Sequence, residues 1–90
     1  MKLLAIKPSS KPDKKFMAIF DNKTTHFGAA GMDDYTKTRD KEQRERYRSR
    51  HRKDLDTGDP TKAGFLSWYI LWNKETIGES ITDYKHKFGL

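Results

Sequence analysis

The segment AGFLSWYILW, residues 63–72, is the densest apolar run in the chain and constrains its fold most strongly. It is apolar on nearly every side of a helix, which is typical of a helix buried at the centre of a domain. Asp59 and Pro60 can serve as its N-cap and first-turn pair. We therefore predict a buried helix over residues 60–73, with its two tryptophans in the core rather than stacked on nucleic-acid bases.

Elsewhere the chain is lean in apolar residues, which limits it to one small domain spanning residues 1–90. Only 33% of its 90 residues are apolar, but five Phe, four Tyr and two Trp allow a small core to bury much area. The absence of cysteine excludes disulfides and thiolate zinc sites. No apolar run approaches the roughly 18 residues of a membrane span, and the N-terminal apolar stretch is too short for a secretory signal. We expect an intracellular protein that is neither secreted nor inserted in a membrane.

Alternating apolar residues in the first third predict a three-stranded antiparallel β-meander over residues 1–30. The strands are expected in KLLAIKP, KKFMAIFD and THFGAA, separated by the turn segments SSKPDK and DNKT. In the second strand, Phe16, Ala18 and Phe20 would share one face. Such a sheet becomes stable only when another element packs on one of its faces.

The segment TKTRDKEQRERYRSRHRKDL allows two readings, because the five arginines of RERYRSRHR fall on every second position. A strand would place them in one cationic row, whereas a helix would divide them between the two sides of a narrow stripe that includes Tyr47. The segment has no Gly, Pro, Val or Ile, is rich in helix formers, and can be capped by Thr38 or Asp40. These features favour a basic helix over residues 38–55.

The C-terminal segment predicts a helix over residues 77–88. Thr76 and Glu79 have the spacing of a capping box at its start, and Gly89 is suited to its C-cap. The apolar face of this helix is expected to consist of Ile77, Ile81, Tyr84 and Phe88. The chain is thus predicted to be α+β, with a three-stranded antiparallel meander followed by three helices in a single small domain.

Positive charge is concentrated on the predicted basic helix. Residues 37–54 carry nine Lys and Arg against four carboxylates, a net charge of +5 in a chain whose total is +6. The candidate binding residues are Lys37, Arg39, Lys41, Arg44, Arg46, Arg48, Arg50, Arg52 and Lys53. A helix would arrange most of them in two rows, Arg46–Arg50–Lys53 and Arg44–Arg48–Arg52. Two such rows suit the phosphates on both sides of a groove, or acidic patches on a protein.

Concentrated positive charge of this kind is typical of a protein that binds a polyanion. We expect a non-enzymatic nucleic-acid-binding protein with duplex DNA as its partner and little sequence preference. An acidic protein surface is the alternative partner, and a solvated helix face without any partner is the third reading.

Catalytic and metal-binding patterns are sparse. His26, His51 and His86 lie in three separate predicted elements, and no pair has the i, i+4 spacing of metal ligands. A metal-dependent nuclease built on the adjacent Asp33 and Asp34 is a remote alternative, because such a pair before a helix more often serves capping and turn formation. The GAAG segment lacks the Lys-Ser/Thr of a phosphate-binding loop. No catalytic residue, metal site or cofactor is predicted.

Three segments resemble a known family: THFGAAGMDDYT, RDKEQRERYRSRHRKD and GFLSWYILWNKETIGESITDYKHKFGL. From about residue 16 to residue 90 the chain is similar to small basic proteins of unknown function encoded by large DNA viruses of algae and amoebae. The resemblance implies a viral origin and supplies no known catalytic or binding residues. It would place the protein in the host cell or the virion, in genome packaging or as a structural adaptor at the boundary of genome and shell. A homo-oligomer would also fit so small a core.

Overall fold

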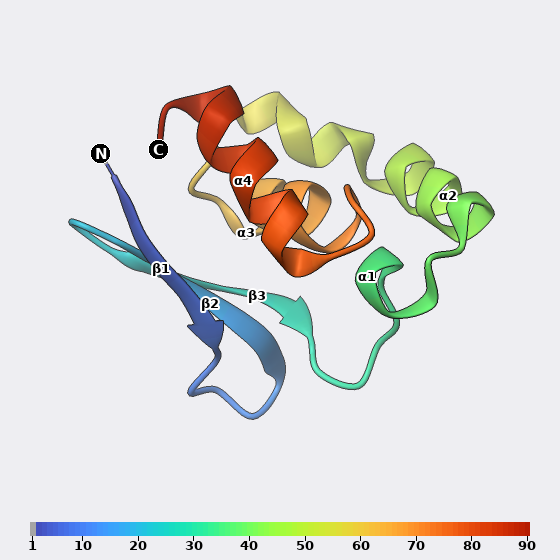
Figure 1. Ribbon diagram of the computed structural model, residues 1–90, viewed down its shortest axis with the longest axis horizontal. Helices are drawn as coiled ribbons and strands as arrows, with labels where there is room; N and C mark the ends of the chain where they lie inside the picture. The colour runs from blue at the N-terminus through green and yellow to red at the C-terminus, as the bar shows by residue number, and fades with distance from the viewer. Residues whose placement is uncertain (1) are drawn as a thin grey trace.

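The structure is a computed structural model that describes residues 2–90, and it consists of a small sheet with helices on one face (Figure 1). The antiparallel strands β1 (Leu3–Pro8), β2 (Lys14–Phe20) and β3 (Thr24–Ala29) lie in chain order. The helical part comprises α1 (Tyr35–Thr38), α2 (Lys41–His51), the 3-10 helix η1 (Arg52–Thr57), α3 (Ala63–Leu66), the π-helical turn η2 (Ser67–Leu71) and α4 (Ile77–Phe88). The predicted α+β fold with its three-stranded meander is confirmed.

Alternation along the strands gives the sheet one buried face. Ala18 and Phe27 are fully buried and Phe20 is nearly so, as the spacing of apolar residues predicted. Phe16 pairs with Phe27 across β2 and β3, and their ring centroids lie 6.0 Å apart. A register shift near the start of β1 accompanies an exposed Leu4, whose relative exposure is 61%. The face with the buried residues is the one that the helices cover.

The predicted continuous basic helix over residues 38–55 is wrong, because the chain breaks it at both ends. Arg39 has a left-handed φ of 53° and its N–H closes α1 by donating to the carbonyl of Tyr35. Asp40 then caps α2, with its carboxylate accepting from the backbone N–H groups of the second and third helical residues. Beyond His51 the winding tightens into η1. Of the two predicted caps, Asp40 is therefore confirmed and Thr38 is not.

The buried helix predicted over residues 60–73 exists, but it starts three residues late. Asp59 does not cap it, because its carboxylate accepts hydrogen bonds from the backbone N–H and the hydroxyl of Thr61 and closes a turn instead. The helix runs as α3 and then as the π-helical turn η2. Leu66 and Ile70 have 0% relative exposure, so the central position of this helix is confirmed.

The C-terminal helix α4 has the predicted bounds and the predicted caps. The Thr76 hydroxyl accepts from the N–H of Glu79 at 3.1 Å, and Gly89 ends the helix in the left-handed region. Tyr84 has 0% relative exposure and its hydroxyl donates to the carbonyl of Pro60. The other three apolar residues of the predicted face are partly buried against the same core. The helix therefore packs across the buried α3–η2 segment, as Figure 1 shows.

Candidate nucleic-acid interface

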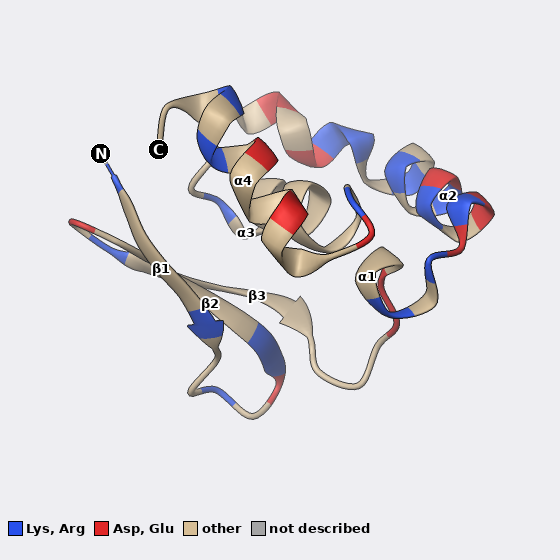
Figure 2. Ribbon diagram, viewed as in Figure 1, with Lys and Arg blue, Asp and Glu red and all other residues tan. Residues whose placement is uncertain are grey.

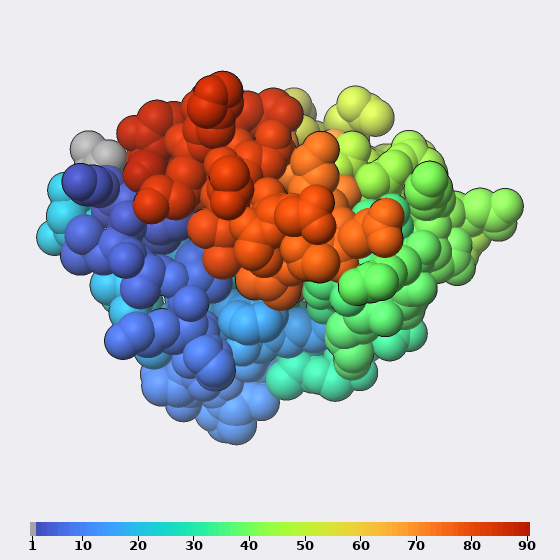
Figure 3. All heavy atoms as spheres, viewed as in Figure 1, coloured from blue at the N-terminus to red at the C-terminus, as the bar shows by residue number. Residues whose placement is uncertain are grey.

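The nine candidate binding residues lie on a path formed by α1, α2 and the first residues of η1. Lys37 belongs to α1, Arg39 follows it, and Arg52 and Lys53 begin η1. The remaining five belong to α2, where Lys and Arg recur along the whole helix (Figure 2). This region projects at one end of the molecule (Figure 3, green). The cations therefore share one region, but their side chains point in different directions.

Arg44 and Arg48 point inward and bind the end of the buried helix. Arg44 Nη1 donates to the carbonyl of Asn73 at 3.0 Å, and Arg48 Nε donates to the carbonyl of Trp72 at 3.1 Å. Arg48 Nη2 also donates to Asn73 Oδ1 at 3.3 Å. The last carbonyls of a helix have no partner within the helix, and positive charge beside them is favourable. The carbonyls of Trp72 and Asn73 directly follow η2, so these two arginines place their positive charge at the C-terminal end of the buried helix.

The same arginines also lie over aromatic rings. The Arg44 guanidinium is 4.7 Å from the ring centroid of Tyr35, and the guanidinium groups of Arg48 and Arg52 are 5.2 and 5.8 Å from that of Trp68. Burial, followed by the proximity of Arg44, lowers the pKa of Arg48, although a guanidinium stays charged at neutral pH. We call Arg44, Arg48 and Arg52 the inner row. The arrangement differs from the predicted pair of free rows, because Arg44 and Arg48 already have internal hydrogen-bond partners, whereas Arg52 is exposed and contacts only the Trp68 ring.

Tyr47 attaches α2 to the core between the two rows. Its ring stacks on Trp72 with centroids 4.4 Å apart and planes 8° apart, and on His51 with centroids 4.2 Å apart and planes 22° apart. Burial raises the pKa of Tyr47 to about 12, since the phenolate would lose hydration. α2 contains no fully buried residue. Its attachment therefore depends on this half-buried ring and on the inner row.

Arg46, Arg50 and Lys53 form the second row of cations, and we call them the outer row. All three are exposed, as predicted, and none forms an ion pair with any carboxylate of residues 2–90. Lys37 and Lys41 are also exposed, and neither is paired within the same residues. Arg39 lies 3.9 Å from Glu75, but both side chains are more than half exposed, so this pair adds little. The outer row is thus an uncompensated set of positive charges on a helix whose other side is held in place.

The residues considered for a metal site lie apart and serve other roles. His26 hydrogen-bonds Ser9 at 2.7 Å in the sheet, whereas His86 is exposed on α4. Asp34 is buried, caps α1 and pairs with Lys15 at 2.6 Å. Within residues 2–90, no three His, Asp or Glu side chains come close enough to hold an ion. Across the same part of the chain, no helix has the length and apolarity needed to cross a membrane.

Comparison with known proteins gives one match. Residues 4–51, more than half of the chain, match a family described as a family of unknown function (DUF5754). The chain belongs to this family. The DUF5754 match runs from β1 to the end of α2 and includes Arg46 and Arg50 of the outer row, whereas the helices that bury the sheet lie beyond it. No curated protein and no solved structure matched the chain.

Sequence reasoning missed the internal role of the inner row. Arg44 and Arg48 looked equivalent to Arg46 and Arg50, since all four alternate along one segment. The available signal was the helical period, because only one row can share the side of Tyr47 that faces the buried helix. Which row this would be depends on tertiary contacts with Asn73, twenty-five residues after Arg48.

Proposed function

We propose that this protein is a non-enzymatic nucleic-acid-binding module that contacts the phosphate backbone with little sequence preference. The observation that supports the proposal is the outer row, Arg46, Arg50 and Lys53, which is exposed and lacks ion-pair partners within residues 2–90. A cation that already has a carboxylate partner gains less from a phosphate than one that has none. Lys37 and Lys41 would extend the contact along the same region.

The attachment of α2 supports the proposal further. A charged side chain on a mobile segment loses much of its binding energy to ordering, whereas side chains on a fixed helix are better organised beforehand. The inner row and Tyr47 fix α2 against the end of the buried helix. The inner row would therefore stabilise the fold, and the outer row would bind the partner.

The resemblance to proteins of large DNA viruses gives the proposal its setting. We propose that the polyanion is the viral genome, during packaging or at the boundary of genome and shell. Backbone contacts without base readout suit a protein that must bind a genome along its length. An acidic surface of a virion protein is the second candidate partner, because it would present the same kind of charge to the outer row.

Binding to a fluorescently labelled DNA duplex, measured by anisotropy at about 50 and about 200 mM salt, tests the proposal. The affinity should fall steeply with salt, and the triple change Arg46→Gln, Arg50→Gln and Lys53→Gln should reduce the slope of log K against log salt by roughly 0.9 per lost phosphate contact. The matched control is Lys7→Gln, Lys23→Gln and Lys85→Gln, which removes the same charge from exposed positions outside α2. No binding at low salt, or equal losses from both triple variants, would contradict the proposal.

A further inference from the structure

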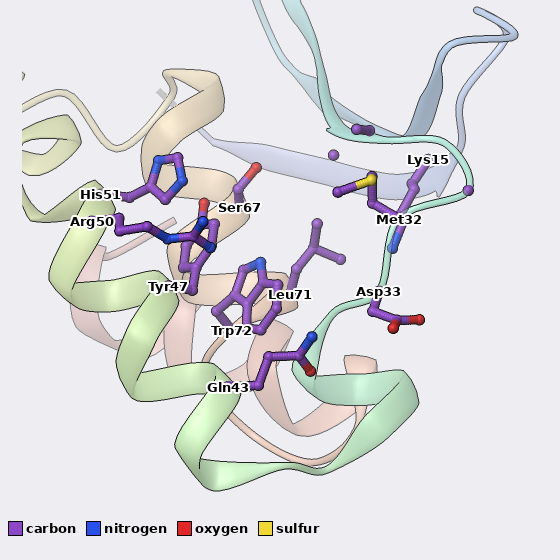
Figure 4. Close-up of a pocket in the computed structure, with 13 residues that line it drawn as sticks. Lys15, Met32, Asp33, Gln43, Tyr47, Arg50, His51, Ser67, Leu71 and Trp72 are labelled. Carbon is purple, nitrogen blue, oxygen red and sulfur yellow. The ribbon is translucent and has the colours of Figure 1, made fainter.

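A cleft of about 520 Å³ lies beside the outer row, between α2, η2 and the loop from β3 to α1 (Figure 4). Gln43, Tyr47 and Arg50 line it from α2, Met32 and Asp33 line it from the loop, and Trp72 lies between these two walls. Its volume is within the range of small-molecule sites. Gly28 lets the strand approach the base of the cleft, since a Cβ at this position would lie 2.8 Å from Leu71 Cδ1.

The apolar part of the cleft suits a flat ring. Met32 has 62% relative exposure and presents its side chain toward the cleft from the loop. Both faces of the Tyr47 ring are covered, by His51 and by Trp72, so the aromatic surface that lines the cleft belongs to one rigid stack. A thioether opposite aromatic groups makes favourable contacts with a planar π-system. The cleft therefore favours a planar ligand over a branched aliphatic one.

Polar groups at the edge of the cleft match the hydrogen-bonding edge of a nucleobase. The side-chain oxygen of Gln43 accepts from the hydroxyl of Thr38 at 2.8 Å, which leaves the amide NH₂ of Gln43 able to donate to a ligand. Asp33 is exposed and forms no ion pair within residues 2–90, so its carboxylate can accept from an N–H group on the edge of a base, such as the ring N3–H of thymine. Proteins recognise unpaired bases through contacts with the base faces and hydrogen bonds to the base edges. In this cleft the Met32 thioether would supply the face contact, and Gln43 and Asp33 would supply the hydrogen bonds.

The available positive charge lies on only one side of the cleft. Arg50 lines the cleft and also belongs to the outer row, next to Arg46 and Lys53 on the same helical side. Lys15, which also lines the cleft, is paired with the buried carboxylate of Asp34 at 2.6 Å and is largely neutralised. An anionic group would therefore bind on the α2 side, at Arg50, and an uncharged ring would extend toward Met32.

The backbone around the cleft provides a separate observation. Ser67, Leu71 and Trp72 line the cleft from the π-helical turn η2 and its end, where the N–H of Trp72 donates to the carbonyl of Ser67 at 3.2 Å. π-helical turns are rare and occur frequently at functional sites. The sequence alone would place an ordinary buried helix here, so this widened turn is an additional indication of a binding role.

We propose that the cleft holds one unpaired nucleobase, with its phosphate on Arg50, so that the protein prefers single-stranded nucleic acid to a duplex. The inference rests on the proposed function, because the strand that supplies the base is the polyanion bound by the outer row. A duplex keeps its bases paired and stacked, and a base reaches a protein pocket only after leaving the stack. Single strands supply such bases without this cost.

The test compares a labelled single-stranded oligothymidylate with a duplex of the same length, by anisotropy at one low salt concentration. Met32→Ala should weaken binding of the single strand roughly two- to ten-fold and leave binding of the duplex unchanged. Leu4→Ala is the matched control, since Leu4 and Met32 have relative exposures of 61% and 62% and Leu4 lies outside the cleft. Ala29→Trp, at an exposed residue that lines the cleft, should fill the site and remove the preference for the single strand.

A titration of thymidine monophosphate, followed by the NMR signal of the Met32 methyl group, separates the outcomes. A saturable shift that Ala29→Trp abolishes, together with a preference for the single strand, supports the proposal. Equal binding of both oligonucleotides with no effect of Met32→Ala overturns it, while the proposed function stands. A saturable shift without that preference assigns the cleft to a free nucleotide and also overturns it. The absence of any shift and of any oligonucleotide binding overturns both proposals.

Discussion

The helices α2 and α4 have similar lengths, eleven and twelve residues, and both begin with a side-chain cap, but they are held by different forces. α4 buries Ser80 and Tyr84 fully and packs an apolar face on the core. α2 buries no residue fully and is attached through Tyr47 and the guanidinium groups of Arg44 and Arg48. A helix can thus be positioned by groups that satisfy the end of another helix, with its remaining surface left free.

This difference suggests why the charge is on α2 and not on α4. A helix that relies on a wide apolar face has fewer positions to offer to a partner. On α2 one ring and two arginines provide the attachment, so the outer row is available at little cost to stability. Substitutions on the inner side of α2 should therefore lower stability, and substitutions in the outer row should weaken binding. Any substitution on the inner face of α4 should destabilise the whole fold.

The largest effect is expected for Tyr84→Ala on α4. This residue has 0% relative exposure, and its removal would leave a cavity in the core, with a loss in the free energy of unfolding of about 3–5 kcal/mol. Urea denaturation followed by circular dichroism would measure it. Tyr84→Phe keeps the ring and loses only the hydrogen bond to Pro60, so its cost should be about 1–2 kcal/mol. If Tyr84→Ala lowered the free energy of unfolding less than Tyr47→Ala does, α2 and not α4 would be the more firmly attached helix.

Tyr47→Ala should cost less, about 2–3 kcal/mol, because the ring is only half-buried and stacks on two others. The loss should appear first in α2, as faster amide hydrogen exchange than in α4. Tyr47→Phe preserves the stack and serves as the control. Equal exchange rates in α2 and α4 of the Tyr47→Ala protein would show that the ring does not attach α2 specifically.

Arg48→Met should destabilise the fold by about 1–3 kcal/mol, because it leaves the carbonyl of Trp72 and the side chain of Asn73 without their donor. Arg48→Lys should also destabilise, since an ammonium cannot reproduce the two-pronged contact. Arg46→Met, two residues earlier on the outer row, is the matched control and should change stability by less than about 0.5 kcal/mol. Thermal unfolding of the three variants would show whether the two rows differ as described.

Alkaline pH should weaken the attachment of α2 through Tyr47. Its pKa is raised from 10.0 to about 12 in the folded protein, so its contribution is complete below pH 10 and is lost as the pH rises through 12. Partial exposure limits this contribution to about 1 kcal/mol. Tyr47→Phe, compared with the unchanged protein in urea between pH 9 and pH 12, should show a flatter pH dependence. Tyr84, whose pKa is also raised by burial, remains in both proteins and does not affect the difference.

The smallest effect on stability is expected for the outer row. Changing Arg46, Arg50 and Lys53 to Gln should leave the free energy of unfolding within about 0.5 kcal/mol, because exposed, unpaired side chains add little to the fold. A modest gain would also agree with the structure, since the change relieves repulsion between neighbouring cations. Unfolding of this triple variant would show that the outer row has internal partners. The conclusion that one side of α2 stabilises the fold while the other is free to bind would then be wrong.

The sequence was sufficient for those elements whose signals are local. The strands followed from alternation, and α4 followed from its apolar period together with Thr76 and Gly89. The break at Arg39 could not be predicted, because a non-glycine residue in the left-handed region has no sequence mark. The late start of α3 was missed because Asp59 suits an N-cap and a turn equally well, and the contact with Thr61 decides between them.

The site was less predictable than the fold. The concentration of charge on one element was visible, and the exposure of Arg46, Arg50 and Lys53 was predicted correctly. The inward direction of Arg44 and Arg48 depends on carbonyl groups at the end of another helix, which no local pattern encodes. The cleft was not foreseen either, because it forms between the loop that contains Met32 and a π-helical turn that sequence periodicity does not distinguish from an α-helix.

The dependence of α2 on Trp72 and Asn73 has a consequence for how the protein folds as it leaves the ribosome. The two hairpins of the sheet join neighbouring strands, so they can form while the rest of the chain is still being made. α2 is synthesised next, but every partner of Tyr47, Arg44 and Arg48 on the buried helix comes later. Until that helix has emerged, the nascent chain presents all four arginines of α2 to solvent, and translation of its last third leaves only Arg46 and Arg50 in that state.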